Sequence, residues 1–391
     1  MLHQVVREHL EAFLRTAAEA GEGVGLPQFV EREFREFLTC GAFEHGFARF
    51  RCEGCAREHL VPFSCKGRGF CPSCGGRRMT ERAAHLVDAV LPRVPVRQWV
   101  LTVPYRLRYR MAWDHGLSRA VLGVYARVLL DVYARGARER GIRDGRTGTV
   151  TGIQRAGSGL NVNVHFHTLA LGGVFSDAHA GALEFSPAPP PREDEVAEVL
   201  ATVRHRVRRL LGRRGLEPGD DTTGDRLVEE SPGLAGIVSA SVQGRVALGP
   251  RAGARVRRLG REVEVEDVRS RGPRQAHVEG FDLHANVWVP ANDRPGLEGL
   301  CRYMLRPPLA QDRLRLRGDG HVVVELKTAW HDGTTQLVFE PLEFLEKLAA
   351  TTPRPEVNLV ICHGVLAPHA QWRRPVVAYG RIVPGPPRRP R

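Results

Sequence analysis

The sequence predicts an α+β fold with an antiparallel sheet, and two stretches of the chain support this prediction. Residues 149–154 and 160–171 both have strand composition, and the turn signal Gly157-Ser158-Gly159 lies between them. Such a pattern is typical of a hairpin. Residues 1–39 have helical periodicity that is broken by several glycines and Pro27, which predicts two N-terminal helices.

Further elements follow along the chain. Helices are expected at residues 79–91, 117–135, 195–211 and 296–306, and strands at 98–103, 281–289, 321–326 and 334–339. The last two strands are close enough in sequence to pair. Residues 187–191 are rich in proline and mark the edge of an insertion expected to extend to about residue 275. The Pro/Arg-rich tail after Val383 is expected to be disordered.

The charge of the chain favours an anionic partner. The 391 residues carry a formal net charge of +13, with a pI of about 10.0, and a chain this basic suits nucleic acid. Lys66, Lys327 and Lys347 are the only lysines, so arginine supplies most of the charge. A GC-rich genome can produce that skew, although the planar guanidinium also suits phosphate better than an ammonium group does.

The compartment expected for the chain bears on its cysteines. No apolar run reaches the length of a membrane span, and the first twenty residues lack the apolar segment of a signal peptide. We therefore expect a cytoplasmic protein with no membrane partner, in which thiols stay reduced. Under those conditions the eight cysteines are expected to bind metal rather than to form disulfides.

Two Cys-x-x-Cys pairs predict a structural zinc site. Cys52 and Cys55 form one pair, and Cys71 and Cys74 form the other after fifteen intervening residues. Four thiolates at this spacing match a tetrahedral zinc site that folds a small module. Cys40 and Cys65, together with His45 and His59, leave alternatives open. They could complete a second zinc site, share ligands with the first, or, for the two cysteines, be small buried apolar residues.

A histidine pair predicts a second, open metal site. His165 and His167 flank Phe166 on a strand whose side chains alternate in period two, so both imidazoles lie on one face. Their Cα atoms are then about 7 Å apart, close enough to bind one ion. Buried or surface histidines on strands are a common alternative. Gln154, on the preceding strand, and His284, on the strand expected at 281–289, are candidates for a third ligand.

Tyr303 is a candidate nucleophile. On the helix expected at residues 296–306, the tyrosine falls off the apolar stripe and lies near Arg302 and Arg306. The stripe consists of Leu297, Leu300, Cys301, Met304 and Leu305. Core packing is the usual role of an aromatic residue, but this position argues against it. A phenol beside cations suits covalent catalysis at phosphate.

The chain resembles the rolling-circle transposases of insertion sequence family 91, including the branch of insertion sequence common regions. The matching segments are residues 63–74, 154–167, 302–310 and 362–369. The resemblance implies a nuclease of the HUH type (a histidine pair around a hydrophobic residue plus a tyrosine on a helix). The implied fold is an antiparallel sheet with helices packed mainly on one face, preceded by the zinc-binding module.

The resemblance also implies roles for the site residues. His165 and His167 would hold Mg²⁺ or Mn²⁺, and Tyr303 would attack single-stranded DNA at transposon ends and target. The products would be a 5′-phosphotyrosine link and a free 3′-OH. Under this interpretation the chain divides into N-terminal helices (1–39), a zinc-binding domain (40–92), a nuclease domain (93–350, with the insertion around 187–275) and a C-terminal segment (351–391).

One departure from the family affects the expected mechanism. The founding branch has two tyrosines four residues apart, whereas the positions four before and four after Tyr303 are Gly299 and Pro307. The chain therefore resembles the single-tyrosine branch. Two other functions remain open from the sequence: a plasmid replication initiator or relaxase with the same chemistry, and a non-enzymatic zinc-ribbon protein that binds nucleic acid.

Overall fold

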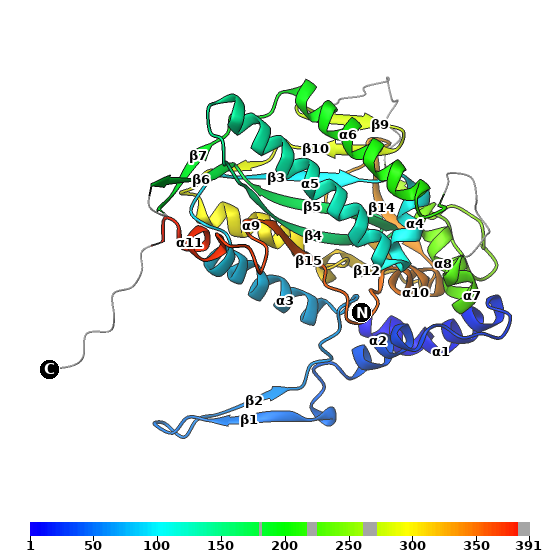
Figure 1. The fold of residues 1–391 in the computed structure, drawn as a ribbon. Helices are drawn as coiled ribbons and strands as arrows, with labels where there is room; N and C mark the ends of the chain where they lie inside the picture. The colour runs from blue at the N-terminus through cyan, green and yellow to red at the C-terminus, as the bar shows by residue number, and fades with distance from the viewer. Residues whose placement is uncertain (180–181, 217–224, 261–271, 382–391) are drawn as a thin grey trace.

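A computed structural model describes residues 1–179, 182–216, 225–260 and 272–381. It confirms a mixed α and β fold with antiparallel sheets and a cysteine-rich N-terminal module (Figure 1). The tail after Val383, expected to be disordered, lies outside the described residues. Within those residues we find no helix that combines the length and hydrophobicity needed to cross a bilayer.

The two predicted N-terminal helices are confirmed as α1 (Leu2–Ala20) and α2 (Gln28–Thr39). Their apolar faces bury Phe13 and Phe34, whose ring centroids lie 5.7 Å apart. A short 3₁₀ turn, Phe43–His45, then leads into a hairpin of β1 (Phe47–Arg51) and β2 (Glu58–Pro62).

Helix α3 (Pro72–His85) begins earlier than the helix expected at 79–91. Pro72 occupies the first turn, where its missing N–H costs nothing, and Cys71 is the N-cap residue. The helix continues into a π-helical turn, Leu86–Val90, before Pro92.

In the described part of the chain the largest sheet has seven strands, all paired antiparallel. The strand order is β15-β4-β5-β3-β10-β9, with β11 also pairing with β3. The predicted hairpin is confirmed as β4 and β5, which places the His165/His167 strand in the middle of the sheet. The bounds are β3 (Val96–Thr102), β4 (Gly148–Ala156), β5 (Val162–Leu171), β9 (Gln275–Val278), β10 (Phe281–His284), β11 (Trp288–Val289) and β15 (Val360–Gly364).

The single strand expected at 281–289 is wrong in detail, because it is split into β10 and β11. Both pieces pair with β3, and the residues between them leave the regular ladder. The guanidinium of Arg97 donates to the carbonyl of Ala285 at the break, 2.8 Å away, so a side chain replaces the missing backbone partner.

Helices cover both faces of this sheet, whereas the resemblance implied mainly one. Helices α4 (Tyr105–Trp113), α5 (His115–Glu139) and α6 (Glu193–Gly212) pack on the face of Val164 and Phe166, and Figure 1 shows α5 and α6 running across it. The ring of Phe166 stacks on Tyr125 at 6.3 Å. Helix α9 (Arg294–Leu305) packs on the opposite face, which carries the histidine pair, and α3 packs against α9.

A second antiparallel sheet of four strands has the order β12-β13-β14-β8. Its pair β13–β14 confirms the pairing predicted for residues 321–326 and 334–339. Its strands are β8 (Arg257–Gly260), β12 (Leu314–Leu316), β13 (Val322–Glu325) and β14 (Thr334–Phe339). The remaining elements are β6 (Gly173–His179), β7 (Ala182–Pro187), α7 (Arg226–Glu230), α8 (Pro232–Val242), α11 (Arg373–Ala378) and a 3₁₀ turn, Gln311–Arg313.

Helix α10 (Pro341–Thr351) joins these parts, since it contacts α1, α8, β5 and β14. It buries an ion pair: the Lys347 ammonium and the Glu346 carboxylate are 2.7 Å apart and at most 1% exposed. Glu346 also accepts hydrogen bonds from the backbone amides of Ala247 and Leu248, and Lys347 donates to the carbonyl of Arg245. The pair therefore fixes α10 to the chain that follows α8.

We predict that Lys347→Met lowers the free energy of unfolding by about 3–5 kcal/mol, because it leaves the Glu346 carboxylate buried without its cation. The double variant Glu346→Gln/Lys347→Met should lose less, since it removes both charges. Urea unfolding of the three proteins measures both effects. A Lys347→Met variant as stable as the parent would show that the pair does not stabilise α10.

Candidate functional site

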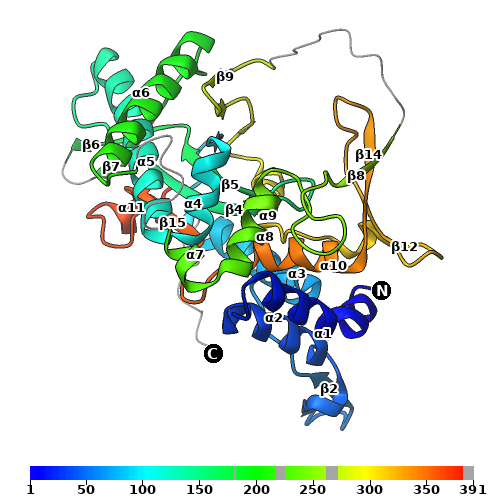
Figure 2. The same ribbon diagram turned by 90° about the vertical axis from the view of Figure 1, so that its right-hand side faces the viewer.

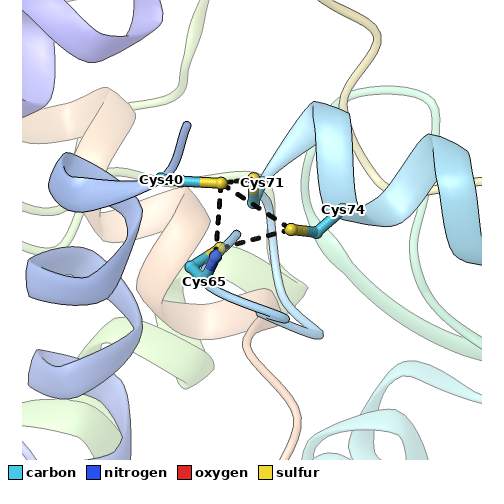
Figure 3. Close-up of side chains that lie close together, drawn as sticks. All are labelled: Cys40, Cys65, Cys71 and Cys74. Atoms are coloured by element: carbon cyan, nitrogen blue, oxygen red, sulfur yellow. Dashed lines mark hydrogen bonds between the residues drawn. The ribbon is translucent and has the colours of Figure 1, made fainter. Parts of the chain in front are cut away.

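Four cysteines form a cluster where α2, the β1–β2 hairpin and α3 meet (Figure 3). The sulfur atoms of Cys40, Cys65, Cys71 and Cys74 all lie within 4.8 Å of one another. Cys40 and Cys74 are 3.7 Å apart, and Cys65 and Cys74 are 3.5 Å apart. Four thiolates bound tetrahedrally at a Zn–S distance of about 2.3 Å would be about 3.8 Å apart, so the cluster fits zinc.

The zinc ligand set predicted from the spacing is therefore corrected. Cys71 and Cys74 belong to the cluster, but Cys52 and Cys55 are exposed at the turn between β1 and β2 and do not join it. The intervening chain forms a hairpin that carries this first pair away. Cys40 and Cys65, left open as extra ligands or buried apolar residues, take the two places.

The loop between Cys65 and Cys71 is held by polar contacts. The Glu33 carboxylate of α2 accepts a hydrogen bond from the amide of Gly69 at 2.7 Å. Arg78 of α3 donates to the carbonyls of Lys66 and Gly67. Arg78 thus holds the loop that carries Cys65 and leads to Cys71.

The histidine pair lies on the sheet face that α9 covers. The ring centroids of His165 and His167 are 4.9 Å apart, and the side chains are 7% and 3% exposed. The structure therefore confirms that both imidazoles lie on one face, as period-two alternation requires. It places them inside the protein rather than on its surface.

The same face brings the tyrosine to the histidines. The ring of Tyr303 is 5.4 Å from that of His167, edge to face, and the Arg306 guanidinium lies 4.5 Å from the centre of the tyrosine ring. Tyr303 is 40% exposed, while Leu297, Cys301 and Met304 of the predicted stripe are buried. Arg302 instead pairs with Glu298, so Arg306 is the cation at the tyrosine.

A glycine permits this close approach of α9 to β4. Gly152 lies opposite His167 in the sheet, and a Cβ atom there would be 2.5 Å from Cγ of Met304. Any side chain at this position would therefore displace α9. The same packing sets how close Tyr303 comes to His167.

Gln154 holds the end of α9. Its amide nitrogen donates to the carbonyls of Tyr303 and Met304, both at 2.9 Å. In a continuing helix these two carbonyls would accept from the amides of residues 307 and 308, but both residues are prolines and have no N–H. Gln154 is 8% exposed, so it is a buried residue rather than a surface glutamine.

Burial keeps both imidazoles neutral. Loss of hydration lowers the pKa of His165 to about 4 and that of His167 to about 3. Nearby positive charge, including Arg306, acts in the same direction. A neutral imidazole offers one nitrogen lone pair, which is the form that binds a metal ion.

The hydrogen bonds of the pair fit metal binding. Nδ1 of His165 donates to the carbonyl of Asn163 at 2.6 Å, which leaves the lone pair on Nε2. Nε2 of the Gln98 side-chain amide lies 3.0 Å from Nδ1 of His167, and Nε2 of His167 is buried without a partner in the structure. Turning that amide by 180° would place its oxygen at Nδ1 as an acceptor, which leaves the lone pair on Nε2 of His167 for a metal.

The two candidates for a third ligand differ in position. Gln154 lies directly opposite His165 on β4, and its amide oxygen is not used in the bonds to α9. His284 lies across β3 from His167, with Val100 between them. Among the described histidines, cysteines and carboxylates, the four-cysteine cluster is the only group of three or more that could hold a metal, so His284 does not join the pair.

A groove of about 710 Å³ opens beside Tyr303. It is lined by residues of α3, by β4 and the turn after it, by the segment following α9 and by Trp330. Its cations include Arg82, Arg306 and Lys327. Gln154 and Tyr303 line the groove, whereas His165 and His167 are buried and do not line it. Cations together with an exposed aromatic ring suit a single strand of nucleic acid.

Two family models match the chain. The one described as "Transposase zinc-binding domain" matches residues 5–103, which include the four-cysteine cluster. The one described as "Putative transposase" matches residues 148–374, more than half of the chain. The chain belongs to this transposase family. Neither the curated proteins nor the solved structures contain a match to it.

The two matches support a transposase like those of insertion sequence family 91. The zinc-binding domain and the cysteine cluster together support a structural zinc ion in this transposase. A transposase acts on DNA, which agrees with the net charge of +13.

Sequence reasoning missed two residues at the site of this transposase. Gln98 was only part of an expected strand, and its contact with His167 depends on which strands are neighbours. Trp330 of the groove lies between two expected strands, where an aromatic residue in a polar turn was a usable signal. Three other aromatic residues that could stack on unpaired bases differ in exposure: Trp99 is buried, Trp113 packs on Phe29, and Tyr105 is exposed.

We predict that Cys65→Ser makes the backbone amides of residues 67–76 exchange with solvent about tenfold faster or more, because zinc binding fixes this loop. Cys52→Ser is the matched control and should leave their exchange unchanged. Hydrogen-exchange mass spectrometry measures both variants. If exchange became faster in Cys52→Ser but not in Cys65→Ser, the result would favour the zinc ligand set predicted from the Cys-x-x-Cys spacing.

We predict that Gln98→Met weakens Mn²⁺ binding at the histidine pair by about 10- to 100-fold, because Nδ1 of His167 loses the side-chain amide that orients its ring. Gln98→Glu is the matched control, since a carboxylate still accepts from Nδ1, and should bind at least as tightly as the parent. Calorimetric titration with Mn²⁺ compares the three proteins. Equal affinity in Gln98→Met and the parent would exclude this role for Gln98.

Proposed function

We propose that this transposase nicks and rejoins single-stranded DNA by rolling-circle transposition, with Tyr303 as the nucleophile and a 5′-phosphotyrosine intermediate. The observation that supports the proposal best is the 5.4 Å contact between the rings of Tyr303 and His167. The two residues are far apart in sequence and belong to different elements, yet an exposed phenol lies beside a buried histidine pair.

The proposed fold class is that of an HUH-type nuclease. An antiparallel sheet carries His165 and His167 on a central strand, and a helix on the same face carries the tyrosine. A histidine pair around a hydrophobic residue and a tyrosine on a helix are the two parts of such a nuclease that support this assignment. The helices α4, α5 and α6 on the opposite face form the larger core.

In the proposed reaction, the Tyr303 hydroxyl loses its proton to solvent and its oxygen forms a bond to the scissile phosphorus. The bond between phosphorus and the 3′ oxygen breaks, and that oxygen leaves as a 3′-OH after taking up a proton. The reverse attack by a 3′-OH rejoins a strand and releases Tyr303. Each step replaces one phosphodiester bond by another without hydrolysis, so the reaction requires no external energy source.

His165 and His167 would hold Mg²⁺ or Mn²⁺ with Gln154 as a third ligand, and the bound ion would act as a Lewis acid on the scissile phosphate. The orphaned Nε2 of His167 and the amide oxygen of Gln154 are the observations that fit this assignment. Arg306, over the tyrosine ring, would contact a phosphate oxygen and orient the strand.

We propose that Cys40, Cys65, Cys71 and Cys74 hold the structural zinc. Such a closed four-thiolate site has no open position for substrate, so its role is to fold the module. The zinc then fixes α3, whose Arg78 and Arg82 line the groove beside Tyr303. Through α3, the module would supply one wall of the path for the DNA strand.

A replication initiator or relaxase would use the same chemistry, but the two transposase family matches favour transposition. A non-enzymatic zinc-ribbon protein would explain the cysteines and the charge. It leaves the contact between Tyr303 and the histidine pair without a purpose.

We predict that the purified transposase forms a covalent adduct with a labelled single-stranded oligonucleotide from the transposon end in the presence of Mn²⁺. Tyr303→Phe should abolish the adduct because it removes the attacking oxygen. Tyr105→Phe, which alters another exposed tyrosine, is the matched control and should retain it. Denaturing gel electrophoresis separates adduct from free DNA.

Two results would contradict this proposal. One is an adduct that persists in Tyr303→Phe. The other is equal DNA binding by the parent and Tyr303→Phe with no adduct in either, which would favour the binding-only function. His167→Ala should also lose the adduct while keeping the zinc content of the parent, which separates loss of the catalytic site from loss of the fold.

A further inference from the structure

The β1–β2 hairpin forms an arm that projects from the rest of the structure, and both views show it extending away (Figures 1 and 2). Five large apolar side chains on and beside the arm are 43–59% exposed. They are Phe43, Phe47, Phe50, Leu60 and Phe63. A lone two-stranded hairpin is marginally stable in water, and gathered exposed apolar residues mark interaction surfaces.

The turn of the arm carries Cys52 and Cys55, both free and exposed. The backbone amide of Ala56 donates to the Cys52 carbonyl, and the Cys52 amide donates to the Arg57 carbonyl, both at 2.9 Å. Ala56 has a φ of 54°, a left-handed conformation that is uncommon outside glycine. The tight backbone turn thus resembles that of a Cys-x-x-Cys metal knuckle, a turn that can present two thiolates to one ion.

The chain itself does not complete a metal site at this knuckle. The four-cysteine cluster already has its full ligand set without Cys52 and Cys55. No third histidine, cysteine or carboxylate of the described residues lies close enough to join them. His59 of β2 pairs with Phe50 of β1, so it lies on the same face of the hairpin as Cys52. It is nevertheless not close enough to join the two cysteines as a metal ligand. A tetrahedral zinc ion bound here would lack two ligands.

We propose that the Cys52–Cys55 knuckle binds a second zinc ion together with the same knuckle of a second copy of this chain. Two copies supply four thiolates, which is the number that zinc requires. A two-fold axis through the ion means that both copies use the same surface, so the assembly stops at a dimer. Because the turn is the outermost part of the arm, a second copy can reach it without meeting the body of the first.

One apolar residue of the arm agrees with this occupant. Phe50 lies on the same face of the hairpin as Cys52 and two residues before it, so a second arm that meets the first at the turn would cover its side chain. Phe47 and Leu60 lie on the opposite face and are not part of this contact. The inference does not depend on the proposed function of Tyr303, because the arm contains no residue of that site.

The test uses the full chain, purified with a phosphine reductant and without added chelator. Light scattering after size exclusion gives the mass, and elemental analysis gives the zinc content. The parent should be a dimer with about 1.5 zinc ions per chain, one in each four-cysteine cluster and one shared. Cys52→Ser/Cys55→Ser should be a monomer with about one zinc ion per chain, and that retained ion reports an intact cluster. His59→Ala is the matched control and should match the parent.

Other outcomes overturn the proposal. A monomeric parent with about one zinc ion per chain shows that the knuckle binds none. About two ions per chain, or loss of zinc in His59→Ala, shows a site within one chain. A dimer that persists in the double serine variant shows a different interface. A double serine variant that loses only affinity for a single-stranded oligonucleotide, with its mass unchanged, shows that the arm binds nucleic acid instead.

Discussion

The contact on which the candidate site depends is the packing of α9 against β4 at Gly152. A methyl group at Gly152 would lie 2.5 Å from Met304, so the helix can approach only because no side chain is present. Gln154 then fixes the end of the helix through the carbonyls of Tyr303 and Met304. Period-two alternation places Gly152 and Gln154 on the face that carries the histidine pair. One strand therefore both admits the helix and anchors it, and the phenol lies beside the imidazoles as a result.

The cysteine cluster is connected to the same helix. Gly75 of α3 directly follows the cluster residue Cys74, and a Cβ at Gly75 would lie 2.9 Å from Cβ of Pro307, just beyond α9. The chain after Tyr303 thus rests on the first turn of a helix that begins at the cluster. The helix that carries Tyr303 therefore packs directly on α3 of the zinc module.

The sequence predicted most elements because their patterns are local. The hairpin that carries His165 and His167, the two N-terminal helices and the exposed position of Tyr303 all follow from periodicity and turn residues. The zinc ligand set failed because spacing counts residues and does not give the path of the chain. Strand-like residues on both sides of Cys52–Cys55 form a hairpin, and that pairing takes the two thiols away from Cys71.

Other parts of the site could not be read from the sequence. Gln98 contacts His167 only because β3 is the neighbour of β5, and the strand order is set by the whole sheet. The strand expected at residues 281–289 looked continuous because its composition is uniform, while its break at Ala285 depends on Arg97 of another strand. Long-range pairing, rather than local propensity, decides such details.

The prolines that follow α9 affect how this transposase could process the two DNA ends of a transposon. Helix α9 ends at Leu305, and Pro307 and Pro308 prevent it from continuing. The helix therefore cannot present a second tyrosine one turn beyond Tyr303. Under the proposed chemistry, one Tyr303 side chain would be joined to one DNA end at a time, and would have to release that end before it attacks the next.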